Sequence, residues 1–273
     1  MRRRLINCRP SRGAAILWGA LPLVAAIAVY ALFSAMRQAA NSQDKLLPGM
    51  MAFLDAINRM AIEPDKRTGD ILFWIDTASS LRRLALGMVS ATAIGLVFGI
   101  AIGIIPYVRA GLSTFVAVVS MIPPMAVLPI LFIVFGLDEL SKVVLIIIGV
   151  APCLIRDLGL KTAEIPNELI IKAETLGAST WQIILRVVLP QVAPKLINAV
   201  RLQLGPAWLF LISAEAIAAS DGLGYRIFLM RRYLAMDVIL PYVAWITLLA
   251  FLMDRGLRRI NRTCFPWAVG EAE

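Results

Sequence analysis

The stretch KAETLGASTWQIILRVVLP, residues 172–190, is a polar, turn-rich passage between two long apolar segments. Gly177 is suited to end a helix, because glycine adopts the left-handed conformation at no steric cost. Ser179 and Gln182 follow with the S-x-x-Q spacing of a capping box, which begins a new helix. Pro190 cannot extend the hydrogen-bond ladder, so we expect the second helix to stop there. The passage therefore predicts two short helices joined by a tight turn.

The composition of the whole chain is that of a membrane protein. Of its 273 residues, 60% are hydrophobic and 16% are charged, whereas a soluble domain carries roughly 25% charged residues. The formal charge is +9. The basic residues lie at the edges of apolar runs, which fits membrane topology better than a nucleic-acid surface. We therefore expect an all-α membrane protein and no nucleic-acid partner.

The residue types that carry most enzyme chemistry are scarce. The chain has no histidine, which removes the commonest metal ligand and the usual general base. Its cysteines, at positions 8, 153 and 264, are far apart and form no CxxC pair. No P-loop sequence occurs either. We expect no catalytic residue, no metal site and no cofactor bound by this chain.

Apolar runs predict about six transmembrane helices, because a spanning helix needs about 20 mostly apolar residues. The first run, 13–36, follows Arg2, Arg3 and Arg4, so a cleaved signal peptide is the alternative. The run is longer than the apolar part of a signal peptide, which favours a membrane anchor. The other predicted spans are 84–108, 110–137, 141–161, 194–219 and 238–255.

Basic residues orient these spans. Arg and Lys gather in the tail 1–12, in the loop between the fourth and fifth spans, and after the sixth span at residues 255–262, just before the C-terminal tail 263–273. The positive-inside rule assigns these segments, and so both termini, to the cytoplasm. On the other side, the long loop 37–80 contains LPGMMAFLDAINRM with apolar residues near helical spacing. We expect a helix lying on the outer membrane surface there, or else a loop packed on the bundle, with 81–262 as one transmembrane domain.

On this topology the opening passage faces the cytoplasm. Asn167 can cap its first helix, which carries an apolar face beside Glu168, Lys172 and Glu174. We interpret this helix as a docking element for a cytoplasmic partner, whose motion the second helix passes into the fifth span. A loop that only packs on the bundle is the alternative.

The passage resembles the cytoplasmic EAA loop of type I ABC importer permeases. In that family Glu-Ala-Ala precedes a Gly, and Ile-x-Leu-Pro follows after nine intervening residues. With Gly177 on the family's Gly, Val187, Leu189 and Pro190 fall on Ile, Leu and Pro without a gap. The Glu-Ala-Ala triplet falls on residues 171–173, of which Ala173 alone matches. The resemblance assigns ATPase coupling to Glu168, Ile171, Lys172, Ala173, Glu174, Gly177, Ala178, Leu189 and Pro190.

Two further stretches are similar to the nitrate/sulfonate/taurine/bicarbonate branch of that family. Residues 121–146, MIPPMAVLPILFIVFGLDELSKVVLI, resemble the segment that joins its third and fourth spans. Residues 201–227 resemble its fifth span and outer gate, and the likeness covers about 75–262. The chain is also similar to permeases that accompany urea carboxylase, whose gene clusters are tied to the use of guanidine or urea nitrogen. The stretches that carry this likeness are KLLPGMMAFL, EPDKRTGD and RRYLAMDVILPYVAWITLLAFLMD.

The resemblance implies the permease subunit of an ATP-binding-cassette importer in a bacterial inner membrane, forming the pathway of a small polar solute. It implies a separate ATPase dimer that binds ATP and Mg²⁺, a second permease copy in a homodimer, and a periplasmic or lipid-anchored substrate-binding protein, all within membrane lipid. The alternative is an autonomous ion-coupled secondary transporter. Such a transporter often uses several buried carboxylates, and Glu215 is the one acid that we place inside a span, since Asp157 and Asp254 are counted with the cytoplasmic ends. An intramembrane enzyme is a further alternative with few candidate residues.

Candidates for the pathway lie in the third and fifth predicted spans. Glu215 is an ionisable residue within a span, which marks a functional site by default; a carboxylate satisfied by a neighbouring span is the alternative. Prolines can break a helix where it borders a cavity, or simply kink it for packing. Arg201 is expected near the inner interface, and Gly95, Gly99 and Gly103 favour close helix packing. The predicted pathway and gate residues are Pro123, Pro124, Ser213, Glu215, Ser220, Gly222 and Gly224.

Overall fold

The computed structural model describes residues 11–40, 46–64 and 69–271, and every regular element in these ranges is a helix. Five of the described helices are long and apolar enough to cross a membrane, or up to six if one bent pair counts as a span. The predicted all-α membrane fold is confirmed. The five long helices are α1 (Arg12–Ala40), α3 (Leu72–Ile104), α6 (Glu139–Ala163), α9 (Leu189–Ala218, which α8 and a π-helical turn precede) and α11 (Met236–Cys264).

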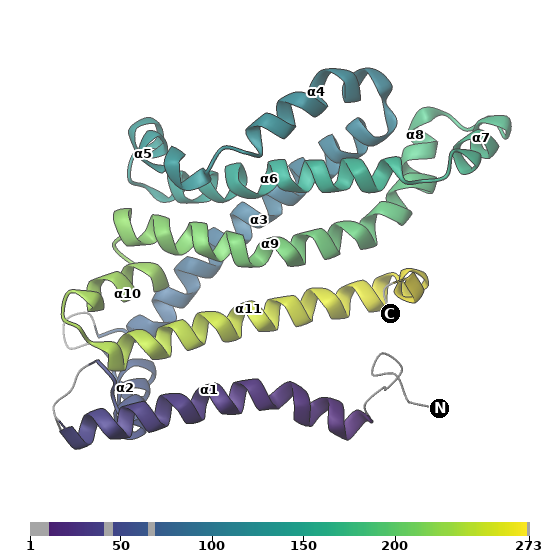
Figure 1. Cartoon of the computed structure of the whole chain (residues 1–273). Coiled ribbons are helices and arrows are strands. Elements are labelled where there is room, and N and C mark those ends of the chain that lie inside the picture. The colour runs from purple at the N-terminus through teal and green to yellow at the C-terminus, as the bar shows by residue number, and fades with distance from the viewer. Residues whose placement is uncertain (1–10, 41–45, 65–68, 272–273) are drawn as a thin grey trace.

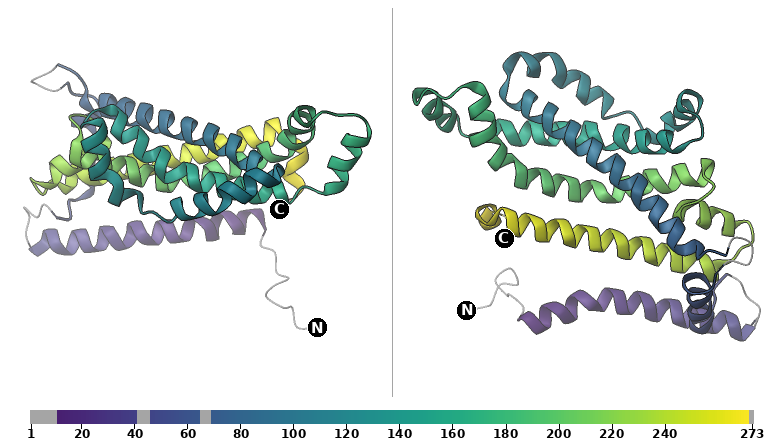
Figure 2. Two further views of the ribbon diagram at one scale, coloured as in Figure 1. Left: turned by 90° about the horizontal axis from the view of Figure 1, so that it is seen from above. Right: turned by 180° about the vertical axis from the view of Figure 1, so that it is seen from behind.

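The long helices form a bundle with two distinct ends. α6, α9 and α11 lie side by side and α3 crosses them, while α1 runs along the edge of the bundle with most of its side chains exposed (Figures 1 and 2). One end, which we name the α7 end, carries α7 (Asn167–Thr175), α8 (Thr180–Ile183), the start of α1 and the close of α11. The opposite end, the α10 end, carries α2 (Met50–Ala61) and α10 (Leu223–Arg231).

The predicted span 110–137 is broken. α4 (Pro106–Val119) and α5 (Pro124–Phe135) meet at an angle of 93°, so they form a broken span or a re-entrant loop. Pro123 and Pro124 lie at the break, and proline has no N–H to continue the ladder of α4. The third predicted span is therefore interrupted at its prolines, where the sequence predicted a break or a kink.

α3 also starts earlier than predicted, at Leu72 instead of 84. Its first turns contain Asp76 and Arg83, which precede the span predicted from hydropathy. Both side chains are almost fully buried, because they pair with other charged groups. The predicted helix in the outer loop is present as α2, and it packs on α3 and α11.

Glycines let α3 approach α6 closely. A Cβ added at Gly95 would lie 2.7 Å from Leu154 Cβ, and one at Gly99 would lie 2.6 Å from Leu158 Cβ. Both distances are below van der Waals contact, so the predicted role of these glycines in close packing is confirmed.

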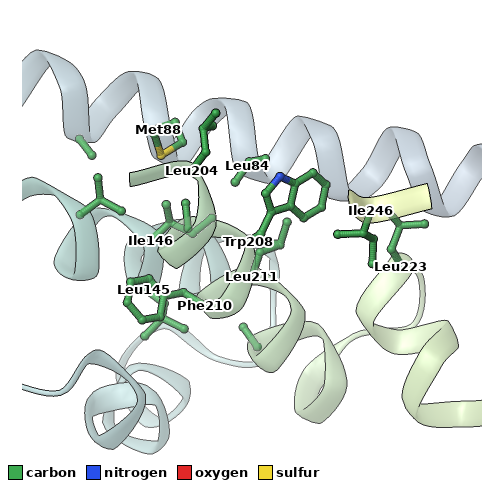
Figure 3. Packing of buried hydrophobic residues seen from close by; sticks show 14 of the residues in the cluster. Leu84, Met88, Leu145, Ile146, Leu204, Trp208, Phe210, Leu211, Leu223 and Ile246 are labelled. Carbon is green, nitrogen blue, oxygen red and sulfur yellow. The ribbon is translucent and has the colours of Figure 1, made fainter. Parts of the chain in front are cut away.

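On its other side α3 packs against α9. Figure 3 shows Leu204 and Trp208 of α9 facing Met88 and Leu84 of α3, within the main apolar cluster. The bundle core thus holds α3, α6 and α9 together.

Candidate functional sites

The turn between α7 and α8 has the conformation that its sequence predicts. Gly177 has φ +78°. Its N–H donates to the Glu174 carbonyl at 2.9 Å, and the Ala178 N–H donates to the Ala173 carbonyl at 3.0 Å. This pair of bonds is the Schellman motif, which satisfies the last carbonyls of α7. Asn167 is not the cap that was predicted: Pro166 occupies the N-cap position, and no side chain caps α7.

A capping box begins α8, as predicted. The Gln182 N–H donates to Ser179 Oγ at 3.3 Å, and the Ser179 N–H donates to Gln182 Oε1 at 2.8 Å. Each side chain thus satisfies a backbone group of the other residue. The direction in which α8 leaves the turn is fixed by these two bonds.

The predicted stop at Pro190 is wrong, because the chain stays helical from Thr180 to Ala218. A π-helical turn, Ile184–Val188, precedes Pro190. The wider turn makes room for the proline ring, and Pro190 then sits in the first turn of α9, where a missing N–H is tolerated. The Gln191 side chain donates to the Val187 carbonyl at 2.9 Å. α8 and α9 are consequently one continuous helical segment.

The α7–α8 hairpin is largely exposed, apart from an apolar seam in which Ile170, Ala173 and Ala178 pack against the core cluster that contains Ile183. α7 has no buried residue. Leu176 is 87% exposed and Trp181 is 66% exposed, and Trp181 is a surface residue that the sequence reasoning did not select. Of the predicted coupling residues, Glu168, Ile171, Lys172, Glu174 and Gly177 are exposed, while Ala173, Ala178, Leu189 and Pro190 are partly buried.

At the α10 end, Glu215 is completely buried and fully hydrogen-bonded. Its Oε1 accepts from Arg83 Nη1 at 2.7 Å and from Ser80 Oγ at 2.8 Å, and its Oε2 accepts from the Gly224 N–H at 2.9 Å. These partners come from α3 and from the first turn of α10. The contacts favour the alternative of a carboxylate satisfied by a neighbouring span.

Arg83 is the centre of this cluster and was missed from the sequence. Its Nε and Nη2 donate to the two carboxylate oxygens of Glu139 at 2.5 and 2.7 Å, and its Nη2 also donates to Asp221 Oδ1 at 2.5 Å. Lys142 adds a second cation, 2.9 Å from Glu139. Because charge-assisted bonds of this kind are strong, Arg83 ties α3 to α6, α9 and the α9–α10 turn.

The α9–α10 turn is held by side chains of α3. The Gly222 N–H donates to Asp76 Oδ1 and the Leu223 N–H donates to Ser80 Oγ, both at 2.9 Å. Gly222 has φ +115°, a conformation that a side chain would strain. Burial raises the pKa of Asp221, but hydrogen bonds from Ser79 and Arg83 outweigh it and leave this pKa below its usual value.

The predicted pathway residues do not all come together. Glu215, Gly222 and Gly224 belong to the Arg83 cluster. Ser213 donates to the Leu209 carbonyl within α9, and Ser220 is exposed beside the turn. Asp76 is a second buried acid within a membrane helix, which corrects the prediction that Glu215 stands alone there.

Arg201 lies in the half of α9 toward the α7 end. It donates to Asp254 of α11 at 2.8 Å, so a carboxylate partly within the bundle neutralises it. This pair joins α9 to α11, and nothing in its geometry requires a role in transport.

Comparison with known proteins agrees with this architecture. Residues 91–264 match the family described as binding-protein-dependent transport system inner membrane component. The chain is similar to the taurine transport system permease protein TauC of Escherichia coli, with 38% identity over 200 residues, 72% of each chain. It is also similar to the nitrate import permease protein NrtB of Synechococcus elongatus, with 26% identity over 192 residues, 68% of each chain.

The fold is similar to that of a solved transporter. An inward-facing structure of the MetNI methionine ABC transporter matches with a TM-score of 0.62 and 24% identity, covering 70% of this chain and 95% of that one. The bundle, the family match and these relatives agree on a membrane component that provides a path and carries out no enzymatic step. The chain belongs to the binding-protein-dependent transport system inner membrane component family and is a permease of an ABC importer.

Proposed function

We propose that two copies of this chain form the pathway of an importer for a small solute that carries an oxyanion group. The relatives named for taurine and for nitrate support this substrate class, because both solutes are small and present negatively charged oxygens. The resemblance to permeases that accompany urea carboxylase suggests guanidine or urea as the alternative to an oxyanion solute. A substrate-binding protein would deliver the solute to the α10 end, which we assign to the outside.

The exposed α7–α8 hairpin is the observation that carries the coupling part of the proposal. α7 projects from the bundle without a buried residue, and a Schellman turn and a capping box set its angle. α8 continues into α9, whose far end holds Glu215. We propose that a separate ATPase dimer, which binds ATP and Mg²⁺, binds α7. When the ATPase dimer closes, α7 moves the continuous helix formed by α8 and α9.

Co-purification with the cognate ATPase tests this coupling. Gly177→Pro fixes φ near −65° and removes the N–H that the Glu174 carbonyl accepts, so the turn cannot form. We expect wild-type protein in lipid to bind the ATPase and stimulate ATP hydrolysis, and Gly177→Pro to do neither. Glu174→Ala shows whether this carboxylate replaces the glutamate of the family pattern.

The matched control is Gly136→Pro, because Gly136 also has a positive φ, +75°, but lies between α5 and α6. It should strain the backbone to a similar degree and leave ATPase binding intact. If the control loses binding as Gly177→Pro does, general misfolding accounts for both, and the coupling role of α7 is wrong.

Binding proteins loaded with taurine, nitrate, guanidine or urea identify the cargo in the same assay. We expect stimulation with an oxyanion solute. Stimulation by guanidine alone would replace the oxyanion assignment. A chain that binds no ATPase and moves solute under an ion gradient would overturn the coupling proposal.

A further inference from the structure

Two cavities adjoin at the α10 end of the bundle. The larger, of about 410 Å³, lies among α2, α3, α10 and α11 and is lined in part by Arg59, Glu63 and Arg226. The smaller, of about 210 Å³, lies between α2, α3 and α11 and has an almost entirely apolar lining. Met60 and Phe73 line both cavities. The two cavities therefore lie side by side, and we name the first the charged half and the second the apolar half of one candidate site.

The charged half offers two cations and one carboxylate. Arg226 is mostly buried, and its Nε donates to Asp76 at 2.8 Å. Arg59 lies 3.5 Å from Asp237 in an exposed pair, and such pairs hold their partners weakly. Glu63 is exposed and makes no ion pair with any residue that the structure describes. A ligand with one negative and one positive group would satisfy these charges together.

The apolar half extends along the membrane helix α11. Its lining runs from Pro241 to Leu248, a rise of about 10 Å along the helix. Leu248 of α11 and Ile57 of α2 are exposed on its edge, so the space opens toward surrounding hydrocarbon.

Trp245 lines the apolar half, and Trp74 packs edge-on against Trp245 with 5.7 Å between the ring centroids. Trp245 Nε1 donates to Thr77 Oγ1 at 3.1 Å, and Trp74 Nε1 donates to the Ala61 carbonyl at 3.2 Å. Tryptophan is enriched at the boundary between hydrocarbon and headgroups. This enrichment supports a headgroup level for the charged half and an acyl-chain level for the apolar half.

We propose that this candidate site binds one phospholipid whose headgroup carries a phosphate and an ammonium group, as in phosphatidylethanolamine. Arg59 and Arg226 hold the phosphate, Glu63 holds the ammonium group, and one acyl chain follows α11 from Pro241 to Leu248. The lipid fills the space between α2 and the bundle and fixes α2 against α11. Its leaflet, the outer one, follows from the proposed orientation; the site itself does not depend on it.

Lipid retention after delipidation tests the site. The full chain is washed in detergent, reloaded with phosphatidylethanolamine, phosphatidylglycerol or diacylglycerol, and its bound lipid is counted by native mass spectrometry. We expect about one phosphatidylethanolamine per chain, and weaker retention of the other two lipids. Ala244→Trp, which fills the apolar half, and the pair Arg59→Ala with Glu63→Ala should each lower retention roughly fivefold.

Each variant has a matched control outside the space. Val243→Trp adds the same bulk at the next residue of α11, and Arg232→Ala removes an exposed arginine of the α10–α11 turn. Neither residue lines either cavity, so both controls should retain lipid as the wild type does. Equal losses in the controls would overturn the proposal.

Two other outcomes would also overturn it. Equal retention of all three lipids would mean that boundary lipid without headgroup recognition fills the space. Displacement of the lipid by soluble phosphoethanolamine, with Ala244→Trp binding this compound as the wild type does, would mean that the charged half alone takes a soluble ligand. Because the readout is bound lipid, failure here leaves the ATPase coupling experiment unaffected.

Discussion

At the residue scale, Arg83 makes the α10 end a single charged unit. Its guanidinium reaches Glu139, Glu215 and Asp221 while only 2% of its side chain is exposed. A buried charge is tolerated when it is paired, and removing one partner leaves the other uncompensated. Each member of the cluster therefore depends on the others, and removing one destabilises the fold.

Glu215→Ala should be strongly destabilising. It leaves Arg83 Nη1, Ser80 Oγ and the Gly224 N–H without their shared acceptor. Breaking a buried ion pair costs about 3–5 kcal/mol, measurable as the free energy of unfolding in mixed micelles. Glu168→Ala removes an exposed carboxylate of α7 and should change this free energy little. A loss for Glu215→Ala as small as for the control would contradict the role of the cluster.

Asp221 gives the α10 end a defined acid response. Its pKa is lowered in the folded state, so its stabilising contribution is complete above the unfolded pKa and is lost as the pH falls through the lower folded pKa. The difference in Tm between wild type and Asp221→Asn should stay constant from pH 7 to about 5 and shrink only below about 4. A difference that shrinks between pH 7 and 5 would contradict this assignment.

At the element scale, the contact between α3 and α6 predicts opposite effects for one substitution at two sites. Gly→Ala inside a helix normally stabilises by roughly 0.5–1 kcal/mol. Gly111→Ala in α4 should do so, since nothing lies within 4 Å of the added Cβ. Gly99→Ala should destabilise, because its Cβ would meet Leu158 Cβ at 2.6 Å and force α3 and α6 apart. Thermal unfolding of both variants in the same lipid checks the two signs.

Elements with local signals were predictable from the sequence. The membrane helices follow from apolar length, and the turn at Gly177 and the capping box at Ser179 follow from neighbouring residues. Predictions failed where a neighbour in space decides the outcome. The stop predicted at Pro190 failed for a local reason instead, because the π-helical turn just before it keeps the chain helical.

The charged site was predictable only in part. Glu215 was selected because an acid in an apolar span is conspicuous. Arg83 was not selected, because its partner Glu215 lies 132 residues away in the sequence and no local pattern indicates that pair. The start of α3 was missed for the same reason. Asp76 and Arg83 are charged, so the sequence around them resembles a loop outside the membrane until their partners in space are known.

At the scale of the whole molecule, the two ends of the bundle carry different features. The close of α11 shares an end with the α7–α8 hairpin, whereas α2, α10 and the Arg83 cluster occupy the other (Figure 1). If the hairpin meets a cytoplasmic ATPase, the close of α11 must also be cytoplasmic.

Cysteine labelling checks this orientation. Cys264 is exposed at the close of α11. With Cys8→Ser and Cys153→Ser, it should resist a membrane-impermeant maleimide in intact spheroplasts and react in inverted vesicles. Ser220→Cys in a chain with Cys264→Ser, at the opposite end, should give the reverse pattern. Labelling of Cys264 from outside would reverse the proposed topology.

The Arg83 cluster also has a consequence for biosynthesis. Arg83 leaves the ribosome long before Glu215, and at 5–20 residues per second the intervening 132 residues take roughly 7–26 s to make. Glu139 arrives first, but the cluster is incomplete until α9 and the turn at Asp221 are inserted. During that interval a cation sits in the membrane domain without its full set of partners, which is costly. A nascent chain that stops before α9 therefore leaves Arg83 without Glu215 and Asp221, and α3 without the ion pairs that tie it to α9 and the α9–α10 turn.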